Sequence, residues 1–159
     1  MPTLTPISHI STFTTTQLCN PATNFTYMQN GSASVCVRLS TEVMNYTSAR
    51  KACQEYGGNL YTMKTQEKIN IFKKLADAGN YQIWLGLDDL ETEDVFKWVD
   101  DGSVLNSSWR DVLFPVIKPD NAFTGEDCIS YNYFFSKSLN DGDCSLLMNF
   151  MCEMVMFTA

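Results

Sequence analysis

The sequence predicts an α+β domain in which two short helices precede several short strands and one long loop. Two stretches of the first half, near residues 45–57 and 65–79, place apolar residues at helical spacing. Stretches in the second half are shorter and rich in aromatic and aliphatic residues, as strands are. The chain of 159 residues is long enough to bury the core of one such domain.

The first 18 residues differ in composition from the rest of the chain. Residues 1–18 are rich in Thr and Ser, and we expect a tail or stalk beside a domain that spans residues 19–156. His9, the single histidine, lies in this tail, so the domain cannot build a Ser-His-Asp triad or a His-based zinc site. Paired carboxylates of the glycosidase type are the enzymatic arrangement that composition leaves open.

Charge and cysteine content indicate the class of protein. The net charge of -7 argues against nucleic-acid and anionic membrane partners and suits a cation-binding protein. No apolar run approaches the ~20 residues of a membrane-spanning helix, and no apolar stretch near Met1 resembles a secretion signal. Six cysteines without a CxxC pair favour disulfides, which form in extracellular proteins. Four glycosylation sequons support the same location, at Asn24, Asn30, Asn45 and Asn106.

We therefore expect a secreted protein or the ectodomain of a longer one, whose leader the given sequence lacks. The first element expected within it is a hairpin over residues 19–36, with Gly31 in its turn. Asn45 is expected to cap the first helix, and Gly57-Gly58 to end it. The buried face of this helix is expected to hold Tyr46, Ala49 and Cys53.

A short strand is predicted over Leu60–Met63, before the second helix. Thr65 is expected to cap that helix and Gly79 to end it. Its apolar stripe consists of Ile69, Phe72 and Leu75. Both helical stripes are interpreted as ordinary core faces.

The remaining strands are predicted over residues 81–87, 96–99, 128–134 and 150–156. In the first of these, Ile83, Leu85 and Leu87 share one face and Trp84 the other. Residues 103–127 are expected to form a long loop with little regular structure. Loops of this length are usually functional or disordered.

The stretch from Lys118 to Cys144 carries the chemistry of the chain. Carboxylates and side-chain amides crowd into it, and Ca²⁺ takes about 6–8 such oxygen ligands. A bond between Cys128 and Cys144 would bring the two halves of this cluster together. The alternative interpretation is a solvated acidic loop.

Several short motifs in this order, together with the cysteine spacing, resemble a known family. They are Ala49…Cys53, Gly57-Gly58-Asn59-Leu60, Trp84-Leu85-Gly86-Leu87, Phe96-Lys97-Trp98-Val99-Asp100, Glu126-Asp127-Cys128, and Asn140-Asp141…Cys144…Phe150-Met151-Cys152-Glu153. The sequence resembles a C-type lectin-like domain in its long form, from Cys19 to about Val155. The resemblance implies two helices flanking small antiparallel sheets, a long ligand-binding loop and no catalytic activity.

The resemblance also implies which cysteines pair. Six cysteines alone allow about 15 connectivities. The family pattern implies the pairs Cys19–Cys36, Cys53–Cys152 and Cys128–Cys144.

In this family a sugar-binding calcium is held by a Glu-Pro-Asn or Gln-Pro-Asp triplet, a later Glu and an Asn-Asp pair. The resemblance places these ligands on Lys118-Pro119-Asp120, Glu126 and Asn140-Asp141, with a cis peptide bond before Pro119. Leu139 replaces the Trp before the Asn-Asp pair, and Lys118 replaces the first acceptor of the triplet. A lysine cannot ligate calcium. Either Lys118 neutralises Glu126 and Asp141 in place of the metal, or it points outward and Asp120, Glu126, Asn140 and Asp141 hold Ca²⁺.

Two further features of the site follow from the resemblance. Asp120 is closer to the galactose-type triplet, and Phe123 lies near the position of an aromatic residue that stacks on galactose. A second calcium site is implied, although a solvated acidic turn explains the same residues. Its implied ligands are Asp89, Glu93, Asn121, Glu126 and Asp127.

Two functions remain open from the sequence. The first is a calcium-dependent carbohydrate-binding module that gains strength from multivalency, for which the domain could oligomerise. The second is a calcium-independent module that binds an extracellular protein. Lys118 and the apolar segment 112–117 favour it, although local packing also explains that segment.

Overall fold

The computed structural model describes residues 19–115, 119–121, 125–134, 137–154 and 156. The predicted tail, Lys118 and Phe123 lie outside these residues. The helices are α1 (Tyr46–Glu55), α2 (Gln66–Ala76), α3 (Ser107–Leu113) and the 3₁₀ helix η2 (Pro21–Thr23). The strands are β1 (Thr26–Asn30), β2 (Ala33–Leu39), β3 (Asn59–Leu60), β4 (Gln82–Asp88), β5 (Lys97–Trp98), β6 (Cys128–Asn132), β7 (Ser138–Gly142) and β8 (Asn149–Met154).

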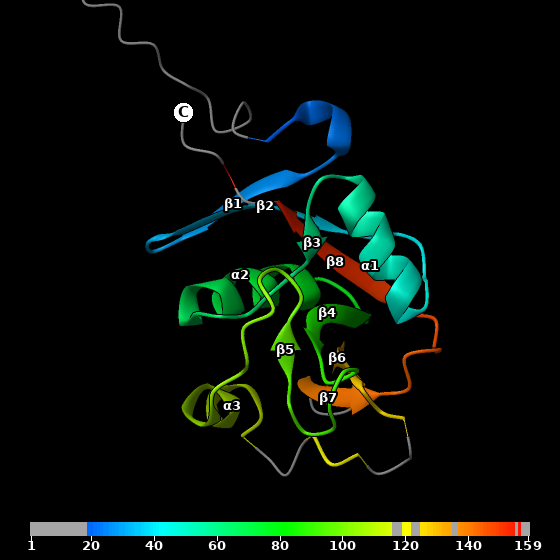
Figure 1. Cartoon of the computed structure of the whole chain (residues 1–159). Helices are drawn as coiled ribbons and strands as arrows, with labels where there is room; N and C mark the ends of the chain where they lie inside the picture. The colour runs from blue at the N-terminus through cyan, green and yellow to red at the C-terminus, as the bar shows by residue number, and fades with distance from the viewer. Residues whose placement is uncertain (1–18, 116–118, 122–124, 135–136, 155, 157–159) are drawn as a thin grey trace, which may run out of the picture.

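The strands form one continuous sheet in the order β1-β2-β8-β4-β6-β7, and β3 and β5 pair with β8 and β4. Figure 1 shows the two halves of this sheet, with β1, β2 and β8 above β4, β6 and β7. β4 and β8 pair in parallel, whereas the other pairs are antiparallel. The α+β class is confirmed, and the expected antiparallel pairing holds for the described strands except where β4 and β8 meet in parallel.

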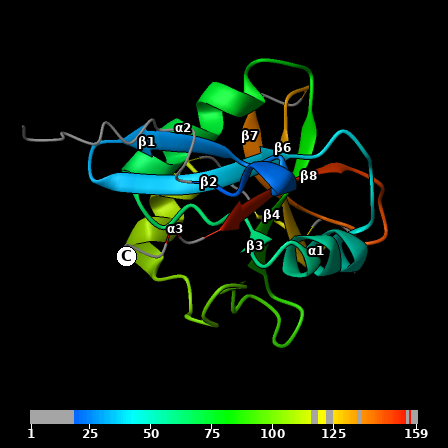
Figure 2. The ribbon, with the colours of Figure 1, turned by 90° about the horizontal axis from the view of Figure 1, so that it is seen from above.

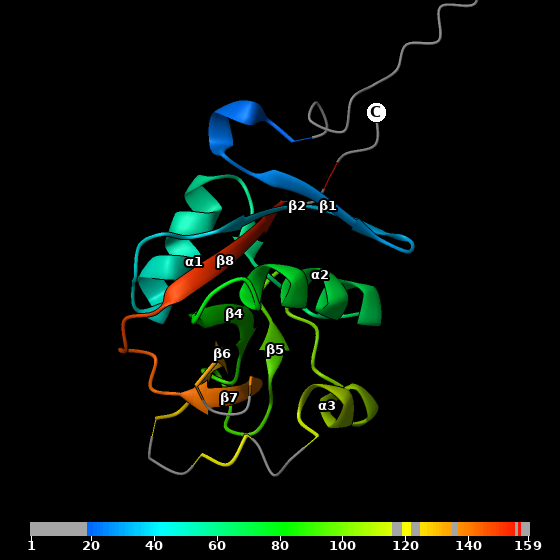
Figure 3. The ribbon, with the colours of Figure 1, turned by 180° about the vertical axis from the view of Figure 1, so that it is seen from behind.

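Helix α1 begins and ends as the sequence predicts. The Asn45 side chain accepts the Ser48 N–H at 2.9 Å, and Gly57 takes a φ of +84° just after the helix. The helix lies along β8 (Figure 3), and its predicted apolar face is buried. No helix within the described ranges is long and apolar enough to cross a membrane.

Helix α2 also begins as predicted, with Thr65 Oγ1 accepting the Lys68 N–H at 3.3 Å. It ends at Ala76 with Asp77 as its cap, so the expectation that Gly79 ends it is wrong. Gly79 does not adopt a positive φ, and the Tyr81 ring packs against it. The hairpin of β1 and β2 lies over α2 (Figure 2).

All three cysteine pairs implied by the resemblance are present, and none of the six cysteines is free. Gly31 takes a φ of +53° in the turn of the β1–β2 hairpin, as predicted. The bridges join β2 to the segment just before η2, α1 to β8, and the start of β6 to the segment just after β7. They are Cys19–Cys36, Cys53–Cys152 and Cys128–Cys144.

Two apolar clusters lie on opposite faces of β4. As predicted, Ile83, Leu85 and Leu87 belong to one cluster and Trp84 to the other. Tyr46 packs edge-on against Trp84, with ring centroids 5.5 Å apart. The packing of β4 on both faces makes it the centre of the molecule.

Three predictions about regular structure are wrong. Helix α3 lies within the stretch expected to be irregular, and β7 lies where no strand is predicted. The strand expected over Leu60–Met63 is only the two-residue β3, since Tyr61 still bonds Met151 of β8 but its carbonyl accepts from Gly86 of β4, and the Thr62 N–H turns to the Glu153 side chain. In the apolar segment, Leu113 and Phe114 are buried and Val112 is 45% exposed, so local packing explains its first half. Residues 116 and 117 of that segment lie outside the described residues.

Candidate functional site

The pairing of β6 with β7 positions the Asn140-Asp141 pair. Asn140 lies opposite Ser130 and Asp141 opposite Ile129 in this antiparallel pair. The Cys128–Cys144 bridge ties the same strands together, close to Glu126. The loop after β4 and the segment around Asn121 come to this end of the sheet, at the bottom of Figure 1.

A first cluster of carboxylates forms here from three of the predicted ligands. One oxygen from each of Asp120, Glu126 and Asp141 lies within 4.8 Å of the others. Asp141 is only 1% exposed, and its Oδ1 and Oδ2 accept the backbone N–H groups of Asp120 (3.2 Å) and Asn121 (2.6 Å). These two hydrogen bonds hold the segment 119–121 over the end of β7.

Asn140, the neighbour of Asp141 on β7, lines the same hollow as Glu126 and Asp141 and has an oxygen without a described partner. Its Oδ1 is buried, and no described group donates a hydrogen bond to it. A buried amide oxygen without a partner costs about 1–3 kcal/mol. Carboxylate and amide oxygens are the ligands that Ca²⁺ prefers, so the four residues fit a calcium ion.

A second cluster consists of Asp89, Glu93 and Asp127, again with oxygens within 4.8 Å. Asp89 is 4% exposed, and its Oδ2 accepts the Asp94 N–H at 2.8 Å. The other oxygen of Asp89, Oδ1, is buried without a hydrogen-bond donor among the described residues. This cluster therefore also fits a cation on the observation of an unpartnered buried oxygen.

The electrostatics of the second cluster are unfavourable without a cation. Burial raises the pKa of Asp89 to about 6, and the nearby charges of Glu93 and Asp127 act in the same direction. Asn121 connects the two clusters, because its backbone N–H bonds Asp141 and its Nδ2 donates to Glu93 Oε1 at 2.6 Å. The resemblance implied Asn121 and Glu126 as ligands of the second calcium. In the structure the Asn121 amide contacts Glu93 of the second cluster as a hydrogen-bond donor, and Glu126 lies in the first cluster.

A hollow of about 490 Å³ adjoins the first cluster on the face of β6 and β7. Sequence reasoning missed its further residues, although alternation along β6 places Ser130 and Asn132 on one face. Leu146 and Leu147 are exposed at its edge, by 49% and 65%. The residues that line it are Gln82, Glu126, Ser130, Asn132, Asn140, Asp141, Gly142, Asp143, Leu146, Leu147 and Met148.

Some predicted features lie outside the described residues or stay predictions. Lys118 and Phe123 lie outside the described residues. The peptide bond between Lys118 and Pro119, expected to be cis, is therefore also outside them. Of the sequon residues, Asn24 and Asn106 are exposed and Asn30 and Asn45 partly so. Glycan attachment at these four positions stays a prediction.

The comparison of the sequence with protein families gives a match to the family described as "Lectin C-type domain", over residues 42–154. The matched segment contains both acidic clusters and more than half of the chain. The chain belongs to the C-type lectin family. The resemblance drawn from the sequence is thereby confirmed.

Curated relatives of this lectin domain include proteins of primates. It is 31% identical to CD209 antigen-like protein 2 of Macaca mulatta over 138 residues, which make up 86% of this chain and 50% of that protein. It is 30% identical to the CD209 antigen of Papio hamadryas over 138 residues, 86% of this chain and 36% of that protein. The chain spans half or less of the length of these relatives.

Solved structures of C-type lectins share the fold. The carbohydrate-recognition domain of mouse scavenger receptor C-type lectin superposes with a TM-score of 0.71 at 26% identity, covering 87% of this chain and 99% of that one. The corresponding domain of cow CD23, studied with a GlcNAc2Man3 oligosaccharide, gives 0.71 at 27% identity, with 89% and 98% covered. The C-type lectin fold is confirmed.

Proposed function

We propose that this lectin domain binds carbohydrate through a calcium ion held by Asp120, Glu126, Asn140 and Asp141. The observation that carries the proposal is the convergence of three carboxylates within 4.8 Å, together with an unpartnered Oδ1 on Asn140, which lines the same hollow as Glu126 and Asp141. Like charges so close repel one another, and a divalent cation removes both the repulsion and the unmet hydrogen-bonding need. The carbohydrate-recognition domains among the similar structures support the choice of a sugar as ligand.

Within this proposal the protein residues have two tasks. Asp120, Glu126, Asn140 and Asp141 hold the ion, which when bound supplies coordination positions for two neighbouring hydroxyls of a sugar. Carboxylate oxygens of the same side chains would also accept hydrogen bonds from those hydroxyls. The Asn140 amide N–H₂ would donate a hydrogen bond to a sugar oxygen. The backbone N–H groups of Asp120 and Asn121 fix Asp141 in place before the ligand arrives.

The second cluster is proposed to hold a structural calcium. Asp89, Glu93 and Asp127 come from the loop after β4 and the segment before β6, which the ion would join. Because Asn121 bonds both Glu93 and Asp141, this ion would stiffen the segment that carries Asp120. Its binding would therefore support the sugar site indirectly.

The sugar class and the biological setting extend the proposal. Asp120 favours a galactose-type ligand on the family pattern, with Phe123 proposed to stack on the sugar. A shallow sugar site binds weakly, so avidity from several domains in an oligomer would supply useful strength. We propose an extracellular location, as a secreted protein or an ectodomain, which suits the three disulfides.

The second candidate function is calcium-independent recognition of an extracellular protein. The lysine at position 118 favours it, because an ammonium near Glu126 and Asp141 would take the role of the ion. The two functions differ in their response to chelation. A protein ligand bound in this way would stay bound in EDTA.

The test is retention of the full chain on galactose and mannose columns, with elution by EDTA. We expect calcium-dependent retention that Asp141→Asn and Glu126→Gln abolish. Asp143→Asn is the matched control, since Asp143 is exposed at the end of the same strand and outside the cluster. Thermal melting shows that each variant is folded. Equal retention of Asp141→Asn and Asp143→Asn would place sugar binding elsewhere, and retention that survives EDTA would exclude a calcium-dependent site.

A further inference from the structure

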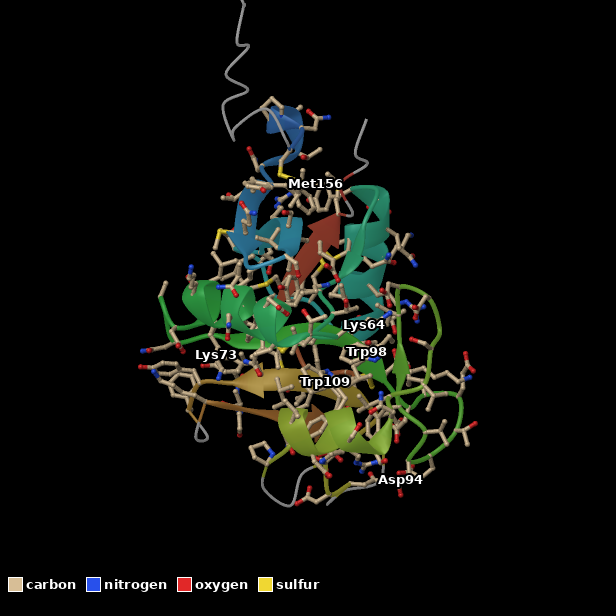
Figure 4. The ribbon with its side chains drawn as sticks, turned by 90° about the vertical axis from the view of Figure 1, so that its left-hand side faces the viewer. Lys64, Lys73, Asp94, Trp98, Trp109 and Met156 are labelled. Carbon is tan, nitrogen blue, oxygen red and sulfur yellow. A yellow bond between two sulfur atoms is a disulfide. The ribbon has the colours of Figure 1, made fainter. Side chains whose placement is uncertain are left out.

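A separate pocket of about 200 Å³ lies between α2, α3 and the start of β7. Figure 4 shows this side of the molecule, with α2 above α3 and Lys73 on α2 at the edge of the region between them. None of its lining residues belongs to either acidic cluster. The pocket is therefore independent of the proposed calcium sites.

The floor of the pocket is apolar and belongs to the protein core. Phe72, Leu113 and Leu139 contribute to it and are 1%, 6% and 8% exposed. Leu139 stands where the family pattern expects a tryptophan, so the side chain at this wall is smaller than in the pattern. Val112, which is 45% exposed, lies at the mouth. An apolar cavity of this kind offers little to a water molecule, which needs two to four polar partners.

Among the described residues that line the pocket, two are charged and both are cations, Lys73 and Lys137, in a chain of net charge -7. No acidic side chain among the described residues lies within ion-pair distance of Lys73. Lys137 Nζ is 3.8 Å from Asp77 Oδ1, and both side chains are about half exposed. Such an exposed pair is weak, so Asp77 leaves the positive charge of Lys137 available to a ligand.

We propose that this pocket binds a small organic anion with an apolar body, such as a short aliphatic or aromatic carboxylate. The apolar body would fill the space over Phe72, Leu113 and Leu139, and the carboxylate would lie between Lys73 and Lys137. The volume is below the roughly 300–1,000 Å³ of sites for drug-sized molecules, which limits the ligand to a short chain or a single ring. The rim charge selects an anion over a neutral analogue of the same length.

Calorimetric titration of the full chain with hexanoate, 1-hexanol and acetate tests the proposal. Hexanoate has both the apolar body and the charge, whereas each of the other probes lacks one of them. We expect hexanoate to bind at least about tenfold more tightly than either, in EDTA as well as in calcium. Equal binding of hexanoate and 1-hexanol, or no heat from hexanoate, would overturn the proposal.

Variants then locate the binding. Lys73→Gln with Lys137→Gln should weaken hexanoate about tenfold and leave 1-hexanol unchanged. Leu139→Trp should abolish binding of both by filling the pocket. Lys74→Gln is the matched control, because Lys74 is the exposed neighbour of Lys73 on α2 and does not line the pocket.

Val112→Glu provides a second test of the binding position, and it changes an exposed residue rather than the core. It adds a negative charge at the mouth and should weaken hexanoate more than 1-hexanol. Hexanoate that binds Leu139→Trp and Val112→Glu as tightly as the natural chain lies elsewhere, and the proposal is then wrong. A pocket filled instead by a side chain of a second copy would appear as a concentration-dependent dimer that hexanoate does not compete for, which would also contradict it.

Discussion

Two regions of the sheet differ in whether their buried side-chain oxygens have hydrogen-bond donors. At the end of β8, Glu153 is 6% exposed, and its Oε1 accepts the Thr62 N–H and hydroxyl, both at 2.7 Å. Its Oε2 pairs with Lys68, whose Nζ also donates to Thr62. At the opposite end, Asp89 Oδ1 and Asn140 Oδ1 are buried without a described donor. Both oxygens of Glu153 have partners among the described residues, whereas these two buried oxygens have none.

This difference separates structural carboxylates from candidate ligands. A buried charge that serves only the fold is expected to have a cation and hydrogen-bond donors of its own, as Glu153 has. The buried Asp88 likewise has a hydrogen-bond donor within the protein, the Tyr46 hydroxyl at 2.8 Å. Asp89 Oδ1 and Asn140 Oδ1 have no such donor among the described residues, and a bound cation would meet that need.

The largest expected effect distinguishes the two ends through their disulfides. The Cys53–Cys152 bridge closes a span of 99 residues at the Glu153 end, and the Cys128–Cys144 bridge one of 16 residues at the ligand end. Removal of the first by a pair of Cys→Ala changes should lower the free energy of unfolding by about 4–5 kcal/mol, and removal of the second by about 3 kcal/mol. Urea unfolding measures both. Calcium binding should weaken more on loss of the second bridge, and the opposite order would show that the Cys128–Cys144 bridge does not hold the calcium ligands together.

The second prediction concerns the ion pair between Glu153 and Lys68. Lys68→Met leaves a buried carboxylate without its cation and should lower the free energy of unfolding by about 3 kcal/mol. Calcium binding should be unchanged, because neither acidic cluster contains these residues. The exposed Lys51→Met is the control and should change stability little, since Lys51 and Glu55 are both mostly exposed. Loss of calcium binding in Lys68→Met would show that the two ends are coupled.

A third prediction concerns pH and the second cluster in EDTA. The pKa of Asp89 is about 6 in the folded protein and near 3.9 in an unfolded chain. Between roughly pH 4 and 6 the folded state therefore binds more protons, and the free energy of unfolding contributed by Asp89 falls as pH rises. Asp89→Asn should remove this slope in thermal unfolding, and Asp143→Asn should retain it. A wild-type slope unchanged in Asp89→Asn would mean that other groups control it.

The smallest expected effect concerns Lys118. Lys118→Glu should tighten calcium binding by roughly tenfold or less, because it replaces a repelling cation with an oxygen ligand. Lys118→Met is the matched control and removes the charge without adding a ligand. A gain shared by both variants would assign the effect to charge, and a loss in both would support Lys118 as the internal substitute for the ion.

The sequence was sufficient for elements with local signals. Asn45 and Thr65 cap α1 and α2 with their own side chains, and residue spacing alone assigns the two faces of β4. Strand β7 has no such signal, because its sequence Ser-Leu-Asn-Asp-Gly is typical of a turn. Pairing with β6 and the Cys128–Cys144 bridge, which are tertiary effects, make it a strand.

Helix α3 and the site show the same limit. Asn106 caps α3 by accepting the Trp109 N–H at 2.8 Å, a signal present in the sequence but followed by only seven helical residues. The membership of Glu126 in the first cluster, and the donor role of Asn121 between the clusters, depend on loop geometry that spacing does not define. The unpartnered oxygen of Asn140 is likewise visible only in three dimensions.

The most direct test of the calcium assignment is a calorimetric Ca²⁺ titration of the EDTA-stripped chain beside three variants. We predict two binding events in the natural chain and in Asp143→Asn. Asp141→Asn should lose the event at the first cluster and Asp89→Asn the event at the second, so that each variant retains one. Absence of heat in the natural chain, or two unchanged events in Asp141→Asn, would contradict the assignment of calcium to Asp120, Glu126, Asn140 and Asp141.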